Sequence, residues 1–167
     1  MSQADFDRFV AANANVLVRT AYLIVGDLHD AEDLVQETLL KVASKWPRVR
    51  RMKSPLGYAR RILINMALRG SSKRSRNRAE LNATAPAETA SDVALLDSHD
   101  ELFDALSALP PRQRAALVLR YFLDLSEAET AAALGCSVGT VKSSTSRGLT
   151  QLKHTLRPNN HPRSIAS

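Results

Sequence analysis

Residues 126–143 read SEAETAAALGCSVGTVKS and predict two short helices joined by a tight turn. Ser126 followed three residues later by Glu129 is the pattern of a capping box, which starts a helix. Gly135 can adopt the left-handed conformation that ends this helix, and Ser137 can cap the next one. Small alanines between the caps allow the two helices to approach closely. The pattern is typical of a helix-turn-helix, with a plain helical hairpin as the alternative.

The helix predicted from Val138 onward has two different faces. Apolar side chains recur on one of them, which is expected to face the core: Val138, Val141, Thr145, Leu149 and Leu152. Short hydroxyls and cations occupy the other side, and such side chains contact bases and phosphates in a major groove. The residues expected to bind duplex DNA are Ser137, Thr140, Lys142, Ser143, Ser144 and Arg147. Cys136 lies in the turn, where an incidental structural role is expected.

Two further helices are expected upstream of this motif, separated by Pro110 and Pro111. Residues 100–109 and 112–123 carry their apolar side chains at helical spacing. The inward side chains of the first are predicted to be Leu102, Phe103, Leu106 and Leu109. Those of the second are predicted to be Ala116 and Leu119, together with Phe122 or Leu123.

The composition favours an all-α fold. The chain has 167 residues, of which only 5% are aromatic, and only 6 are glycine, whereas strands favour aromatic and β-branched residues. One cysteine excludes an internal disulfide. The four histidines have no metal-binding spacing, so no metal, no cofactor and no enzymatic activity are predicted. The absence of a signal-like N-terminus and of a long apolar run predicts a cytoplasmic protein without a membrane partner.

The net charge of +6 is unevenly distributed along the chain. Residues 47–78 carry 11 Lys and Arg and no acidic residue, which suggests a surface for a polyanion or, alternatively, a solvated basic face or disordered tail. Residues 79–109 carry seven acidic residues and no basic one. Residues 76–99, small, polar and acidic, are predicted to be a flexible linker between two small helical domains at 1–75 and 100–156. Residues 157–167 are predicted to be a disordered tail.

Two amphipathic helices are expected before residue 45. Apolar residues at helical spacing over 6–24 predict the first, which Gly26 and Asp27 end. The second is expected to begin near Asp30 and to bury one stripe: Ala31, Leu34, Val35, Thr38 and Val42. The opposite stripe places one leucine among two acids and an amide: Asp33, Gln36, Glu37 and Leu40. A leucine there indicates either packing on a neighbouring element or a docking face with an apolar centre, while a carboxylate metal site is a weaker alternative.

A third N-terminal helix follows a basic loop at residues 48–54. Trp46 and Pro47 are expected to end the preceding helix, and Ser54 is expected to cap the next one before Pro55. The buried face is predicted to comprise Ala59, Ile62, Leu63 and Met66. Another stripe comprises Tyr58, Arg61, Asn65 and Arg69. An aromatic ring, an amide and two guanidinium groups suit single-stranded nucleic acid, although a polar face on a core helix is the alternative.

In combination, four of these segments resemble a bacterial sigma factor of the extracytoplasmic-function (ECF) type, a minimal member of the sigma-70 family with a sigma-2 and a sigma-4 domain. The matching stretches are AEDLVQE at 31–37, YARRILIN at 58–65, LPPRQR at 109–114 and LGCSVGTVKS at 134–143. Each stretch is moderate evidence by itself. Their order and spacing, with an acidic segment between the two halves, make the combination specific.

The resemblance implies a role for each surface in transcription initiation. Asp33, Gln36, Glu37 and Leu40 would dock on the clamp helices of the β′ subunit of core RNA polymerase. The residues that would melt and hold the minus-ten element are Arg50, Arg51, Lys53, Tyr58, Arg61, Asn65 and Arg69, with a base flipped into a pocket of the basic loop. The helix-turn-helix would read the minus-thirty-five element, and the helices before it would pack on the β flap.

Some questions stay open under this resemblance. Residues 144–146 read Ser-Thr-Ser, where many relatives have bulkier or basic side chains, so the base contacts are less predictable. Many relatives are held by an anti-sigma factor, and the sequence does not decide whether this chain is. A stand-alone helix-turn-helix regulator is the main alternative, but such a protein has no need for a strand-melting surface distant from its reader helix. A nucleic-acid enzyme using the carboxylates of 30–37 lacks a general base.

Overall fold

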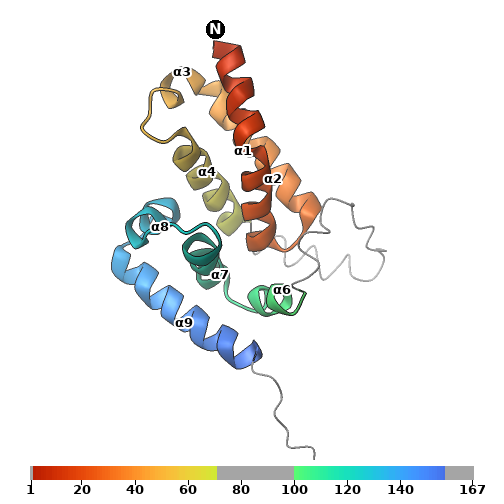
Figure 1. Ribbon diagram of the computed structural model, residues 1–167, viewed down its shortest axis with the longest axis vertical. Coiled ribbons are helices and arrows are strands. Elements are labelled where there is room, and N and C mark those ends of the chain that lie inside the picture. Colours follow the sequence, from red (N-terminus) through yellow and green to blue (C-terminus); the bar gives the residue numbers. More distant parts are fainter. Residues whose placement is uncertain (1, 71–99, 157–167) are drawn as a thin grey trace, which may run out of the picture.

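The computed structural model describes residues 2–70 and 100–156, and both parts are built of helices joined by short turns (Figure 1). The N-terminal half contains α1 (Ser2–Val25), α2 (Leu28–Ser44), α3 (Trp46–Val49) and α4 (Pro55–Arg69). The C-terminal half contains α6 (Asp100–Ser107), α7 (Pro111–Leu117), the π-helical η3 (Val118–Phe122), α8 (Glu127–Leu134) and α9 (Val138–Leu156). The all-α prediction is confirmed. The predicted linker at 76–99 and tail at 157–167 lie outside the described residues.

Helices α1 and α2 form a hairpin that matches the sequence pattern closely. Gly26 turns the chain with a φ of 79°, and the Asp27 carboxylate accepts a hydrogen bond from the Asp30 backbone N–H at 2.9 Å. Because Asp27 is the N-cap, α2 begins at Leu28 and not near Asp30 as expected. The five residues of the predicted inner stripe of α2 are all buried. The opposite stripe of α2 is exposed to solvent.

The segment between α2 and α4 differs from the expected loop. Helix α2 ends at Ser44, shortly before the expected end at Trp46 and Pro47. Trp46–Val49 instead forms a helical turn, because Pro47 is compatible with a first turn and both Trp46 and Val49 are buried. Ser54 caps α4 by accepting a hydrogen bond from the Gly57 N–H at 2.9 Å, as predicted. In α4, Ile64 and Ala67 are buried in addition to Ala59 and Leu63.

The buried face of α4 therefore differs in part from the predicted one. Ile62 and Met66, expected to be buried, are only half-buried at the edge of the core. The cause is the packing around α4, which contacts α1 and α2 on one side and α7 and α8 on the other. A helix enclosed on two sides buries a wider arc than a one-sided amphipathic pattern predicts.

The helix predicted over 112–123 is interrupted by π-helical geometry. Ala116 and Leu119 are buried as expected, and of the two alternatives Phe122 and Leu123, Leu123 packs against the core while Phe122 is 44% exposed. The wider turn of η3 carries the chain out of the 3.6-residue register on which that prediction rested. Tyr121 next to it is 54% exposed.

The caps predicted for the helix-turn-helix are present. Ser126 and Glu129 form the capping box, and Gly135 has a φ of 68°. The Ser137 side chain caps α9 by accepting a hydrogen bond from the Thr140 N–H at 3.1 Å. Val138, predicted to face the core, is 38% exposed because it lies in the first turn of α9 beyond the packed region. Gly148 instead lies at the core contact, where an added Cβ would meet the Leu117 side chain at 3.0 Å.

The two halves share a hydrophobic core. Buried residues of α1, α2 and α4 are continuous with those of α7, η3 and α8, and α8 packs directly on α4. The Arg114 Nε donates a hydrogen bond to the carbonyl oxygen of Leu23 at 2.7 Å, although Arg114 is only 6% exposed. The Phe103 ring stacks on the Tyr22 ring with 5.0 Å between centroids. The chain thus has two helical halves, and these halves pack against each other.

Candidate nucleic-acid and protein-docking surfaces

An apolar groove lies between α1 and α2. It has a volume of about 540 Å³ and is lined by Phe6, Asp7, Val10, Ala11, Gln36, Leu39, Leu40 and Ala43. We call it the α2 groove. Leu40 is 71% exposed, so the interpretation that it packs on a neighbouring element of the chain is wrong. Exposed charged side chains accompany it on α2, where the Lys41 and Glu37 charges lie 3.9 Å apart and the His29 and Asp33 groups 3.7 Å apart.

The contribution of α1 to this groove was missed from the sequence. Phe6 and Val10 belong to the apolar residues whose spacing predicted this helix, and both are only partly buried. A helical pattern shows that a side chain is on an apolar face but not whether a neighbour covers it. Of the four predicted docking residues, Gln36 and Leu40 line the groove, while Asp33 and Glu37 are exposed on the same helix.

The basic turn before α4 is partly tied to α1. The Arg50 guanidinium lies 3.3 Å from the Asp5 carboxylate, and both side chains are about two-fifths exposed (43% and 38%). Arg51 and Lys53 are exposed to solvent. Two of the three predicted cations of this turn therefore project freely, while the third has an ionic partner.

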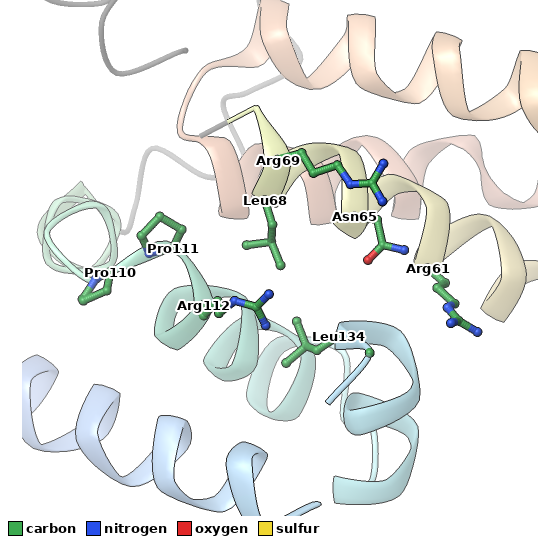
Figure 2. A pocket seen from close by; sticks show the side chains of 9 residues that line it. Arg61, Asn65, Leu68, Arg69, Pro110, Pro111, Arg112 and Leu134 are labelled. Carbon is green, nitrogen blue, oxygen red and sulfur yellow. The ribbon is translucent and has the colours of Figure 1, made fainter. Parts of the chain in front are cut away.

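The predicted nucleic-acid face of α4 is assembled, but the C-terminal half lies across it. We call this the α4 face: Tyr58, Arg61, Asn65 and Arg69. Figure 2 shows Arg61, Asn65 and Arg69 along α4, with Arg112 and Leu134 on the opposite wall of a cavity of about 580 Å³. Tyr58 and Arg61 line a second cavity of about 330 Å³, whose other wall includes Glu129 and Ala132 of α8.

The two halves of the chain also interact electrostatically, through Arg60 of α4 and Glu129 of α8. Burial lowers the pKa of the neighbouring Arg60, and the Glu129 carboxylate of α8 partly opposes this effect by raising that pKa. The carboxylate therefore attracts a cation of α4 from the other half of the molecule.

The predicted duplex-reading residues lie on the outer side of α9. Thr140, Lys142, Ser143 and Arg147 are exposed, whereas Ser144 is half-buried. Some of these groups already have partners: the Ser137 and Thr140 hydroxyl oxygens are 2.9 Å apart, and Lys142 lies 3.7 Å from the Glu127 carboxylate. We call the exposed set the α9 face: Ser137, Thr140, Lys142, Ser143 and Arg147.

A pair of exposed aromatic rings on η3 forms another surface that the sequence did not predict. Tyr121 and Phe122 project from the π-helical turn just before Asp124, which has a φ of 52°. π-Helical turns are frequent at functional sites. The signal that could have identified them is two adjacent aromatic residues, because a regular helix rarely buries both.

Within 2–70 and 100–156, no three His, Cys, Asp or Glu side chains are grouped so that they could hold a metal ion. No helix in these same ranges is both long and apolar enough to span a membrane.

Comparisons with known proteins identify the family. Residues 9–77 match the family described as Sigma-70 region 2, and residues 99–152 match Sigma-70, region 4. The chain is 35% identical to the RNA polymerase sigma-E factor of Streptomyces avermitilis over 91% of this chain and 85% of the relative. It is 36% identical to the RNA polymerase sigma-E factor of Streptomyces coelicolor over 91% and 86%.

A solved structure agrees with this relationship. The sigma factor RpoE of Bartonella quintana, in complex with the anti-sigma factor NepR, matches with a TM-score of 0.70 and 29% identity. The match covers 93% of this chain and 98% of RpoE. Sequence and fold together show that the chain belongs to the sigma-70 family of RNA polymerase sigma factors, as an ECF-type sigma factor that directs transcription initiation.

Proposed function

We propose that this chain docks on core RNA polymerase through the α2 groove and reads promoter DNA through the α4 face and the α9 face. In this role it is a specificity subunit of the cytoplasm and not an enzyme. The observation that carries the proposal is Leu40, a large apolar side chain 71% exposed between exposed charged residues beside an apolar groove. Such a side chain is stabilised when a partner covers it.

The groove suits a helical partner. An amphipathic helix binds by placing apolar side chains in a groove and charged ones at its rim. Burying one leucine contributes roughly 1.5–3 kcal/mol, and Asp33 and Glu37 would favour basic residues on the partner. The β′ clamp helices are the partner that the family relationship proposes for this site.

The exposed rings of η3 form a second docking site for the polymerase. Aromatic side chains are enriched at protein interfaces because each buries a large area with few rotatable bonds. We assign Tyr121 and Phe122 to the β flap, since they belong to the helices that precede the helix-turn-helix. The α2 groove and these rings would then hold the two halves of the chain at separate places on the polymerase.

The two DNA-facing surfaces differ in chemistry. The α4 face combines an aromatic ring, an amide and two guanidinium groups, which suits stacking on unpaired bases of the minus-ten element. The basic turn with Arg50, Arg51 and Lys53 would hold the same strand. The α9 face has short hydroxyls and cations on a helix, which suits the major groove of the minus-thirty-five duplex.

The test is reconstitution with core RNA polymerase and run-off transcription on genomic fragments. Glu37→Lys is expected to weaken core binding by about tenfold, because it reverses a charge beside the groove. Arg147→Ala is expected to weaken promoter binding while core affinity is kept. Glu32→Lys, on an exposed position of α2 outside the groove, is the matched control for the first variant.

The results separate the candidate functions. Promoter-dependent transcripts that need the chain support the proposal, and the same defect in both variants would show that the surfaces are wrongly assigned. Duplex binding without any core binding would favour the stand-alone regulator instead.

We also propose that an anti-sigma protein binds this chain, because RpoE, to which this chain is similar, forms a complex with the anti-sigma factor NepR. Such a protein is expected to compete with core polymerase for the α2 groove. Competition that Leu40→Ser leaves unchanged would argue against this site.

A further inference from the structure

The larger of the two cavities described beside α4 collects positive charge from two distant parts of the chain. Its volume is about 580 Å³, within the range of about 300–1,000 Å³ that is usual for small-ligand sites. Arg61 and Arg69 lie on the α4 wall, and Arg112 of α7 lies on the opposite wall (Figure 2). All three residues are exposed, so a ligand can reach them from solvent. We call this the arginine cavity.

The guanidinium groups of the arginine cavity lack acidic partners. No Asp or Glu is among the residues that line it, and within 2–70 and 100–156 none of the three arginines forms an ion pair or a hydrogen bond through its side chain. Glu129 lines the adjoining cavity, together with Arg61. Cations gathered around one space repel each other, and an anion bound between them removes that repulsion. The cavity therefore suits a polyanionic ligand.

Among anions, phosphates match these groups best. The planar guanidinium carries its N–H donors in a fork that pairs with two phosphate oxygens at once. Because Arg112 lies opposite Arg61 and Arg69, a chain of phosphates between the walls would be bound from two sides. A single phosphate or a carboxylate would pair with fewer of these groups. Charge and shape together favour a polyphosphate.

The rest of the lining suits the base of a nucleotide. Leu68 and Leu134 contribute apolar side chains from the two walls, and Pro110 and Pro111 extend this apolar surface. Ligand sites commonly combine such a surface with a few polar groups that fix orientation. The half-buried Asn65 amide on the α4 wall offers both a donor and an acceptor to the edge of a base. Inorganic polyphosphate would leave these side chains without a partner.

We propose that the arginine cavity binds a nucleoside polyphosphate, with the phosphates held by the arginines and the base placed against the leucines and Asn65. Three of the side chains involved, Arg61, Asn65 and Arg69, also belong to the α4 face. The nucleotide and an unpaired strand of the minus-ten element therefore compete for the same groups. This competition, unlike the binding itself, rests on the proposed function of the α4 face.

Isothermal titration calorimetry on the full chain tests the binding, with ATP, GTP and inorganic tripolyphosphate as probes. Saturable binding of ATP or GTP at a single site is expected, and tripolyphosphate should bind about tenfold more weakly because it lacks the base. Arg112→Ala is expected to weaken nucleotide binding about tenfold, since one charge-assisted pair is lost. Arg19→Ala is the matched control, because it removes the same charge from an exposed position of α1 outside the cavities described above.

Arg112 also separates the nucleotide from DNA, because it is not part of the α4 face. Random-sequence single strands of about 20 nucleotides, longer than a typical single-strand site, serve as the DNA probe and are followed by fluorescence anisotropy. Their affinity is expected to be the same for Arg112→Ala and for the unaltered chain. The tighter-binding nucleotide should displace them from the unaltered chain, and about tenfold more of it should be needed with Arg112→Ala.

If Arg112→Ala does not fold by circular dichroism, Arg112→Lys keeps the charge, loses the planar fork and should weaken nucleotide binding to a smaller extent. The proposal is overturned if neither nucleotide binds saturably, if tripolyphosphate binds as tightly as both, or if Arg112→Ala and Arg19→Ala weaken binding equally. Nucleotide binding by a chain that does not bind the single strands would support the site and overturn the proposed function of the α4 face. Nucleotide binding without displacement of the strands would overturn the competition.

Discussion

Helices α4 and α9 both carry polar, DNA-compatible faces, but their surroundings differ. The α9 face points to solvent, while the α4 face, with Arg61 and Arg69 still exposed, lines open cavities whose other walls belong to the C-terminal half. The difference does not lie in local sequence, since each helix has an apolar side packed on its own half. The difference lies in which other elements of the chain are close to the polar side of each helix. Four predictions test this contrast.

The largest effect is expected from Tyr58→Ala. Loss of one stacking platform costs roughly 1–3 kcal/mol per base, which corresponds to about a fivefold to 150-fold loss of promoter melting. Permanganate reactivity of unpaired thymines in the reconstituted complex measures it. Tyr58→Phe keeps the ring and should stay within about twofold. Equal defects in both variants would mean that the ring does not stack on a base.

Arg147→Ala should have the next largest effect, on the accessible helix. We expect about threefold to tenfold weaker binding to a minus-thirty-five duplex and a salt slope reduced by about one, since one phosphate neutralisation is lost. Lys153→Ala removes a charge further along α9 and serves as the control. An unchanged salt slope would show that Arg147 makes no phosphate contact.

Gly135→Ala tests the turn that aims α9. The φ of 68° is costly for any residue with a Cβ, although no atom lies within 4 Å of the added carbon. The expected loss is about 1–2 kcal/mol of unfolding free energy, entirely conformational. Gly139→Ala is the matched control: it lies in α9 with only the Ser137 Oγ at 3.8 Å and should gain about 0.5–1 kcal/mol. Thermal unfolding distinguishes them, and equal shifts would contradict the turn argument.

The smallest effect is expected from Lys142→Ala. Its pair with Glu127 is solvent-exposed at 3.7 Å, so the unfolding free energy should change by less than about 0.5 kcal/mol. Duplex affinity should fall about twofold to threefold if the ammonium contacts a phosphate. Glu127→Ala, which frees the lysine without removing it, should leave affinity equal or higher. A fall in affinity with Glu127→Ala would show that the ion pair positions the lysine.

Local signals predicted the helix ends well. Ser54, Ser126, Gly135 and Ser137 act through atoms within three or four residues of themselves, so their roles were visible in the sequence. The inner stripe of α2 was also correct, because that helix packs on one side only and its 3.6-residue period is uninterrupted.

The errors occurred where long-range packing or an irregular turn decides the outcome. Ile64 and Ala67 became buried because α4 is covered from two directions. Phe122 became exposed because η3 leaves the regular helical register. Gly148 is a core contact because the Leu117 side chain occupies the space where a Cβ would lie. The helices that cover α4 and the leucine that meets Gly148 are distant from them in sequence, whereas the irregular turn at Phe122 is local.

The candidate sites show the same division. The sequence predicted which residues of α4 and α9 share a face, but not the share of α1 in the α2 groove or the exposure of the η3 rings. It also gave no sign of the Arg114 hydrogen bond to Leu23, which joins residues 91 positions apart.

By itself, the sequence determined the helical content, the caps, the turn of the helix-turn-helix and the polar faces of α4 and α9. All of these follow from interactions within one or two helical turns, where spacing alone fixes which groups meet. Only the tertiary structure decided which faces are open, because accessibility depends on elements that return from distant parts of the chain. Helix α4 is the clearest case. The spacing predicted which of its residues share the polar face, but it did not predict that residues of the C-terminal half lie beside that face.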